Sequence, residues 1–91
     1  MGRDRQPPHV RAWQTVLNEV WPENPMAFRD HPGIPVTVRI QWGRDGEEWR
    51  DGTAKRWDAE HVYVEVDDYP KHRLIGHGVW VRPADVRRPT P

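Results

Sequence analysis

Apolar and polar residues alternate along residues 34–42, with the sequence IPVTVRIQW, which is the pattern of a half-buried β-strand. Pro35 cannot donate a backbone hydrogen bond, so the start of this strand is expected at a sheet edge. The inward face is predicted to carry Ile34, Val36, Val38, Ile40 and Trp42.

The same alternation predicts further short strands toward the C-terminus. The turn residues GRDG at 43–46 lead into a second strand over 48–57, where Asp51-Gly52 predicts a bulge or sharp bend. The expected elements that follow are a turn at 58–60, a strand over 61–66, a long loop over 67–78, a strand over 79–82, a 3-10 turn over 83–85 and a short closing strand over 86–88.

The N-terminal part shows a helical period instead. Within 9–21, five large apolar residues fall in an arc of about 100°, which predicts an amphipathic helix that ends before Pro22. Its side chains Trp13 and Leu17 are expected to be buried. Residues 22–33 are expected to form a loop anchored by Met26 and Phe28. Residues 1–8 and 89–91 are predicted to be a disordered N-terminus and a loose tail.

Five short strands in about 55 residues are too few for a sandwich and fit a strongly bent small barrel. The predicted fold is therefore mostly β: a five-stranded antiparallel barrel of the Src-homology-3-like class (34–88), with one N-terminal α-helix packed on it. Residues 9–88 are expected to form a single domain.

Composition removes several function classes. The 91 residues contain six tryptophans but no cysteine and no serine, so disulfides, thiolate metal sites and the commonest covalent nucleophiles are absent. The cluster of Glu47, Glu48 and Asp51 beside Arg44 and Arg50 indicates a salt-bridged hairpin rather than a catalytic pair. These absences lead us to expect a non-enzymatic protein. No secretory signal or membrane-spanning apolar run is visible, so we also expect a cytoplasmic protein with no membrane association.

A metal site was the remaining chemical candidate. His72 and His77 share one predicted loop with Asp67 and Asp68, but their spacing matches no recurring metal-binding pattern. We therefore expect neither a metal nor another cofactor.

The order of these elements, and several residues within them, resemble the Tudor domains of the Src-homology-3-like barrels. Trp49 and Gly52 match the Trp-Tyr-Arg-small signature of the second strand, with Arg50 and Asp51 in place of its Tyr and Arg. Asp68 and Tyr69 match the later aromatic-x-Asp-Tyr-Gly-Asn signature. Val66 replaces its aromatic residue, Pro70 and Lys71 replace Gly-Asn, and residues 78–86 (GVWVRPADV) resemble the last strand and 3-10 turn.

This resemblance implies a module that recognises a protein segment. Tudor domains hold a methylated lysine or arginine in an aromatic cage, through cation–π attraction to several ring faces. The matching positions here are Trp49 and Tyr69, with Trp42 nearby and Asp68 as a charge partner. The alternative from the residues alone is that these rings cap the small core.

Charge distribution supports two other functions. The net charge is +1 over residues 1–43, −5 over 44–68 and +4 over 69–91. A basic C-terminal third could bind DNA or RNA. The third possibility is a homo-oligomeric structural or phage and mobile-element accessory protein, in which the acidic and basic parts of two copies meet. Trp80 is expected to point outward, between two inward valines. The predicted nucleic-acid contacts are Lys71, Arg73, Trp80, Arg82, Arg87 and Arg88.

Overall fold

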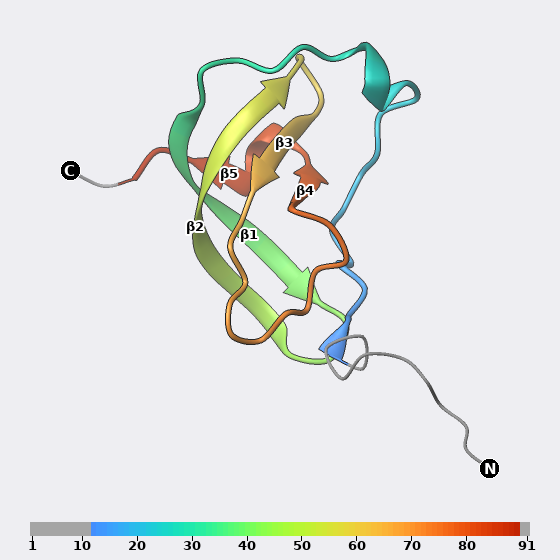
Figure 1. Cartoon of the computed structure of the whole chain (residues 1–91), viewed down its shortest axis with the longest axis vertical. Helices are drawn as coiled ribbons and strands as arrows, with labels where there is room; N and C mark the ends of the chain where they lie inside the picture. The colour runs from blue at the N-terminus through green and yellow to red at the C-terminus, as the bar shows by residue number, and fades with distance from the viewer. Residues whose placement is uncertain (1–11, 90–91) are drawn as a thin grey trace.

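One curled, five-stranded antiparallel sheet forms the centre of the molecule, in the strand order β4-β3-β2-β1-β5 (Figure 1). The structure is a computed structural model, and it describes residues 12–89. Its strands are β1 (Ile34–Trp42), β2 (Gly46–Trp57), β3 (Val62–Glu65), β4 (Gly78–Val81) and β5 (Val86–Arg87), with 3-10 turns η2 (Pro25–Ala27) and η3 (Pro83–Asp85). The strand prediction over 34–42 and the 3-10 turn over 83–85 are confirmed.

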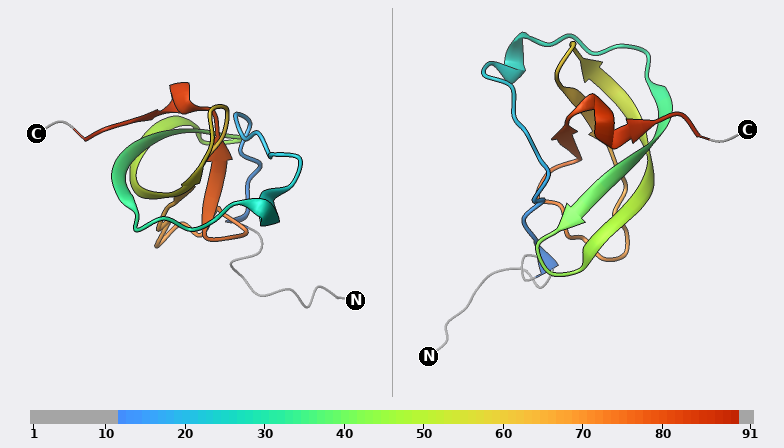
Figure 2. Two further views of the ribbon diagram at one scale, coloured as in Figure 1. Left: turned by 90° about the horizontal axis from the view of Figure 1, so that it is seen from above. Right: turned by 180° about the vertical axis from the view of Figure 1, so that it is seen from behind.

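The inner face of the curled sheet carries the apolar core. Strands β1 and β2 pair from Ile34 opposite Ala54 to Trp42 opposite Gly46, so the alternating apolar residues of β1 point inward as predicted. Valines from β3 and β4 complete this face, and Val64, Val79 and Val81 have no exposed surface. Seen from above, the sheet curls into a half-barrel (Figure 2), an arrangement compatible with a Src-homology-3-like barrel.

The bend of β2 depends on a close approach to β3. A Cβ atom on Gly52 would lie 2.6 Å from Val64 Cγ1 and 2.7 Å from the Glu65 backbone oxygen. Only glycine leaves room for this contact. The register shift itself lies between Ala54 and Arg56. The bulge predicted at Asp51-Gly52 is therefore displaced along the strand.

The N-terminal helix prediction is wrong. Among the described residues of 9–21, the chain runs as a non-helical strap, defined here as residues 14–20, in the gap between β1 and β4, with a turn at Leu17 and Asn18. Val16 forms an antiparallel bridge with Trp42, the Leu17 backbone N–H donates to Gln41 O at 2.7 Å, and the Val20 N–H donates to Trp80 O at 2.8 Å. Residues 9–11 lie outside the described part of the chain.

The helix prediction is wrong because a helix of this length is not stable alone, and the segment can instead pair its backbone with two sheet edges. The strap satisfies backbone groups of both edges, and it buries Val16 rather than the predicted stripe. Leu17 is 64% exposed and Trp13 is 36% exposed. The β-branched residues Thr15, Val16 and Val20 also favour an extended chain.

A second apolar cluster lies outside β3 and β4. Trp80 points outward as predicted, yet it is only 2% exposed, because Phe28, Tyr63 and Trp21 pack around it with ring centroids 5.0, 5.1 and 6.3 Å away. Phe28 thus anchors the preceding loop as expected. Met26 does not, since it is 87% exposed.

The last two elements fasten β1 to the strap. Strand β5 pairs with β1 through Thr37–Arg87 and Val38–Val86, and in the right-hand view of Figure 2, from behind, β5 and η3 lie across the near side of β1. Buried Asp85 of η3 accepts hydrogen bonds from Arg39 of β1 and Asn18 of the strap. No helix within residues 12–89 has the length and apolar character needed to cross a membrane.

Candidate functional site

The connection between β3 and β4, residues 66–77, forms a loop with two closely tied arms. The Val66 N–H donates to His77 O at 3.0 Å where the arms begin, and the His72 N–H donates to Asp68 O at 2.9 Å near the tip. The Asp67 carboxylate accepts the Tyr69 N–H at 3.0 Å and so fixes the start of the turn. The loop reaches the end of the half-barrel where the β1–β2 turn and the strap meet (Figure 1).

Arg73 fixes this loop from inside the half-barrel. Its guanidinium is stacked on the Trp42 ring, with Cζ 3.9 Å from the ring centroid, and the residue is only 2% exposed. It donates to Asp68 from Nε at 3.1 Å and from Nη2 at 2.7 Å, to Asp45 at 3.1 Å, and to Glu48. Such a forked, planar donor suits several carboxylates at once.

The cluster also connects the surrounding elements. Arg50 of β2 adds a second cation to Asp68, at 2.8 Å from Nη1 to Oδ1, and Trp42 Nε1 donates to Glu48 at 2.8 Å. The Arg73 carbonyl accepts the Gln14 N–H of the strap at 3.0 Å. The loop, β1, β2 and the strap therefore meet at one group of charges with Arg73 and Asp68 buried at its centre, which we call the Arg73 cluster.

These contacts shift pKa values within the cluster in favour of the charged forms. Burial by itself would raise the pKa of Asp68, but hydrogen bonds from Arg73 and Arg50 outweigh it, so this pKa lies below its usual value. Glu48 follows the same pattern, with Arg73 and Trp42 as its donors. The hydrogen bond from Arg73 to Asp68 in turn raises the pKa of Arg73. The cluster is fully charged at neutral pH.

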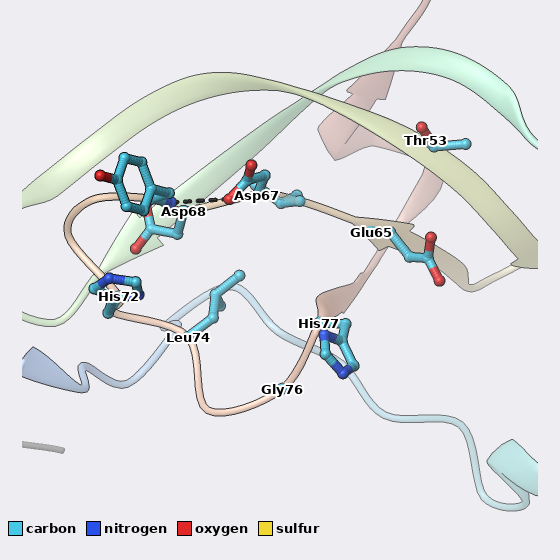
Figure 3. Close-up of a pocket in the computed structure, with 10 residues that line it drawn as sticks. Thr53, Glu65, Asp67, Asp68, His72, Leu74, Gly76 and His77 are labelled. Atoms are coloured by element: carbon cyan, nitrogen blue, oxygen red, sulfur yellow. Dashed lines mark hydrogen bonds between the residues drawn. The ribbon is translucent and has the colours of Figure 1, made fainter. Parts of the chain in front are cut away.

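An open pocket of about 590 Å³ lies over the same loop. In Figure 3, Glu65 and His77 lie at one end of it, Asp68 and His72 lie at the other, and Leu74 lies between them. Its lining also includes Asp67 and Tyr69, so it holds three carboxylates, and the described residues contribute no lysine or arginine to it. Glu65, Asp67 and the Tyr69 ring are exposed, the last by 72%. We call this the acidic pocket.

The predicted aromatic platform is only partly brought together. Asp68 and Tyr69 line the acidic pocket, whereas Trp42 is buried beneath Arg73. Trp49 lies on the outer side of β2, where the Arg87 guanidinium is stacked 3.8 Å from its ring centroid. Beyond the last β2–β3 ladder pair, Thr53–Glu65, the side chains of Arg50 and Asp68 still meet in an ion pair. Within residues 12–89, however, no ring contact joins Trp49 to Tyr69.

The residues of the predicted nucleic-acid surface differ widely in exposure. Arg73 and Trp80 are each 2% exposed and already packed in the two clusters described above. Arg87 is exposed, but its guanidinium is stacked on Trp49. The remaining cations of the set, Lys71, Arg82 and Arg88, are exposed.

Sequence reasoning missed the role of Arg73 and the two exposed carboxylates Glu65 and Asp67. The signal for Arg73 was an arginine five residues after Asp68, but its partners Asp45 and Glu48 are distant in sequence. Asp67 was considered only as a metal ligand beside His72 and His77. In the described part of the chain, no group of three or more potential ligands is placed to hold a metal ion.

Comparison with protein-family models, with curated proteins and with solved structures found no significant match for this chain.

Proposed function

We propose that this protein is a non-enzymatic binding module, and that the acidic pocket recognises a basic side chain in a segment of another protein. The observation that carries the proposal is the pocket's charge: three carboxylates with no lysine or arginine among the described lining residues. Arg50 and Arg73 form ion pairs with Asp68 and so neutralise its charge from inside the half-barrel. Glu65 and Asp67 form no ion pair within residues 12–89, so their charges are open to a ligand.

Tyr69 adds a second attraction for a cation. The Asp67 carboxylate holds the Tyr69 backbone, and the exposed Tyr69 ring contacts His72 edge-on, so a lysine or arginine in the pocket could reach both a ring face and a carboxylate. This retains the protein-recognition part of the Tudor comparison. A multi-ring cage for a methylated side chain is less well supported, because Trp42 is covered by Arg73 and Trp49 by Arg87.

The strength of this contact can be bounded. A cation over an exposed ring contributes about 0.5–1 kcal/mol. Each exposed ion pair contributes about 0.2–1 kcal/mol. Together these terms give roughly 1–3 kcal/mol, whereas a millimolar dissociation constant corresponds to about 4 kcal/mol. The basic side chain therefore supplies selectivity, and other parts of the segment must supply further affinity.

An NMR titration of the ¹⁵N-labelled full chain tests this proposal. The probe is a capped peptide with one arginine among glycines, compared with the same peptide carrying glutamine, both taken well above the millimolar range because the expected dissociation constant is weaker than millimolar. We expect only the arginine peptide to shift the amides of Asp67, Tyr69 and His77. The shifts should weaken with added salt, because exposed ion pairs are screened.

Matched variants separate the pocket from overall charge. Glu65→Gln with Asp67→Asn removes both open charges while keeping the oxygen that accepts the Tyr69 N–H, and it should abolish the shifts. Glu23→Gln with Glu60→Gln removes two exposed charges outside the pocket and should leave them unchanged. Equal shifts with the arginine and glutamine peptides would contradict the proposal.

A further inference from the structure

A second pocket adjoins the acidic pocket on the other side of the returning arm, the part of the 66–77 loop that leads into β4. It has a volume of about 450 Å³ and lies between the strap and this arm. Leu74 and Gly76 line both pockets, so a single extended chain could reach from one to the other. We call the second one the apolar pocket.

Its lining is largely hydrophobic and partly open to solvent. Val16, Leu74 and Tyr63 contribute apolar surface within it, and Trp21 and Ile75 stand at its edge with 62% and 74% of their surface exposed. Exposed apolar groups gathered at one hollow are typical of a binding surface. The Trp80 N–H donates to Glu19, the charged residue of the lining, at 3.3 Å. Among the described lining residues, this pocket too has no lysine or arginine.

The backbone of β4 provides a third feature at the same place. On the outer edge of β4, the Trp80 carbonyl accepts the Val20 N–H of the strap, and the Trp80 N–H donates to the Glu19 side chain. Backbone groups alternate in direction along a strand, so Gly78, two residues earlier, turns its N–H and C=O toward the same edge. The hydrogen bond from Val66 to His77 is consistent with this alternation. Gly78 lines the apolar pocket, and within the described chain its outer backbone groups have no hydrogen-bond partner. They are available to an extended peptide.

We propose that the apolar pocket takes a large aliphatic side chain from the same segment whose basic side chain enters the acidic pocket. The ligand class is then an extended protein segment that pairs a lysine or arginine with a nearby leucine or isoleucine, hydrogen-bonded at Gly78. This inference rests on the proposed function. The continuity of the two pockets and the absence of cations from both linings favour this occupant over a nucleic acid.

The test uses three capped glycine peptides in which one, two or three glycines separate an arginine from a leucine. The reference peptides keep only the arginine or only the leucine. We expect one spacing to bind about tenfold more tightly than the arginine-only peptide and to shift the amides of Ile75 and Gly78 as well as those of the acidic pocket.

Two exposed apolar residues supply matched variants. Ile75→Ser should remove the gain from leucine and leave the affinity for the arginine-only peptide unchanged. Met26→Ser removes a comparable exposed side chain that lines neither pocket, and it should change nothing.

The outcomes distinguish this inference from the proposed function. If leucine adds no affinity at any spacing while the arginine-only peptide still shifts the acidic pocket, the apolar subsite is refuted and the proposed function stands. If the leucine-only peptide binds and the arginine-only peptide does not, the proposed function is refuted. If no peptide binds, both are refuted.

Discussion

Replacing Arg73 by alanine would remove the central cation of the Arg73 cluster. Asp68, which is 6% exposed, would then keep Arg50 as its cationic partner, and Glu48 would lose its closest one. Breaking a buried ion pair from one side costs about 3–5 kcal/mol. Because Arg50 remains, we expect a loss in free energy of unfolding near the lower end, about 3 kcal/mol.

Thermal and urea denaturation would measure this loss. For a chain of this size, 1 kcal/mol corresponds to about 4–8 °C in melting temperature, so the expected fall is roughly 12–24 °C. Arg73→Lys keeps the charge but loses the forked geometry and the stacking on Trp42, and should give an intermediate loss. Arg82→Ala, at an exposed arginine, is the control and should stay within about 0.5 kcal/mol.

A double-mutant cycle isolates the interaction itself. Residues in contact within one charge network show coupling energies of about 0.5–3 kcal/mol. We expect Arg73→Ala and Asp68→Ala to be coupled by at least about 1 kcal/mol, measured in urea. An Arg73→Ala protein as stable as the Arg82→Ala control, or two fully additive changes, would refute the central role of Arg73.

Three further predictions concern acid stability, the strap and the bend of β2. The carboxylates around Arg73 have a lower pKa in the folded than in the unfolded chain, so their contribution to stability is present above about pH 4 and is lost as the pH falls further. The urea midpoint should therefore fall between pH 4 and 2. An unchanged midpoint over this range would contradict the prediction. Val16→Ala should cost about 1–3 kcal/mol and Leu17→Ala less than about 0.5 kcal/mol, whereas a larger loss at Leu17 in thermal melts would support a packed helix. Gly52→Ala should cost at least about 1 kcal/mol because its Cβ would clash with β3, and Gly76→Ala, which meets nothing within 4 Å, should be nearly neutral in the same melts.

Local pattern was sufficient to predict the sheet. The alternation over 34–42 is confirmed residue by residue as β1, and the turn residues placed the second, third and fourth strands within one or two residues of their observed ends. Turn chemistry and period-2 burial act between neighbours in sequence, so they can be read from one chain.

The fold of the N-terminal segment was decided by contacts with residues that are distant in sequence. Residues 12–21 have a helical spacing of apolar groups, but their backbone pairs with Gln41 and Trp80, which lie far along the chain. The arrangement of the candidate site residues also depends on tertiary packing. The ring partners of Trp49 and Tyr69 are Arg87 and His72, and these contacts depend on how β5 and the loop pack.

The most direct measurement of the proposed function is a comparison of two amide chemical-shift maps. The ¹⁵N-labelled full chain would be titrated with the best arginine–leucine peptide and, separately, with a short single-stranded DNA. We expect the peptide to shift Asp67, Tyr69 and His77, and the DNA to shift no continuous surface. The opposite result, with DNA shifts centred on Trp49 and Arg87 and none in the acidic pocket with peptide, would contradict protein-segment recognition.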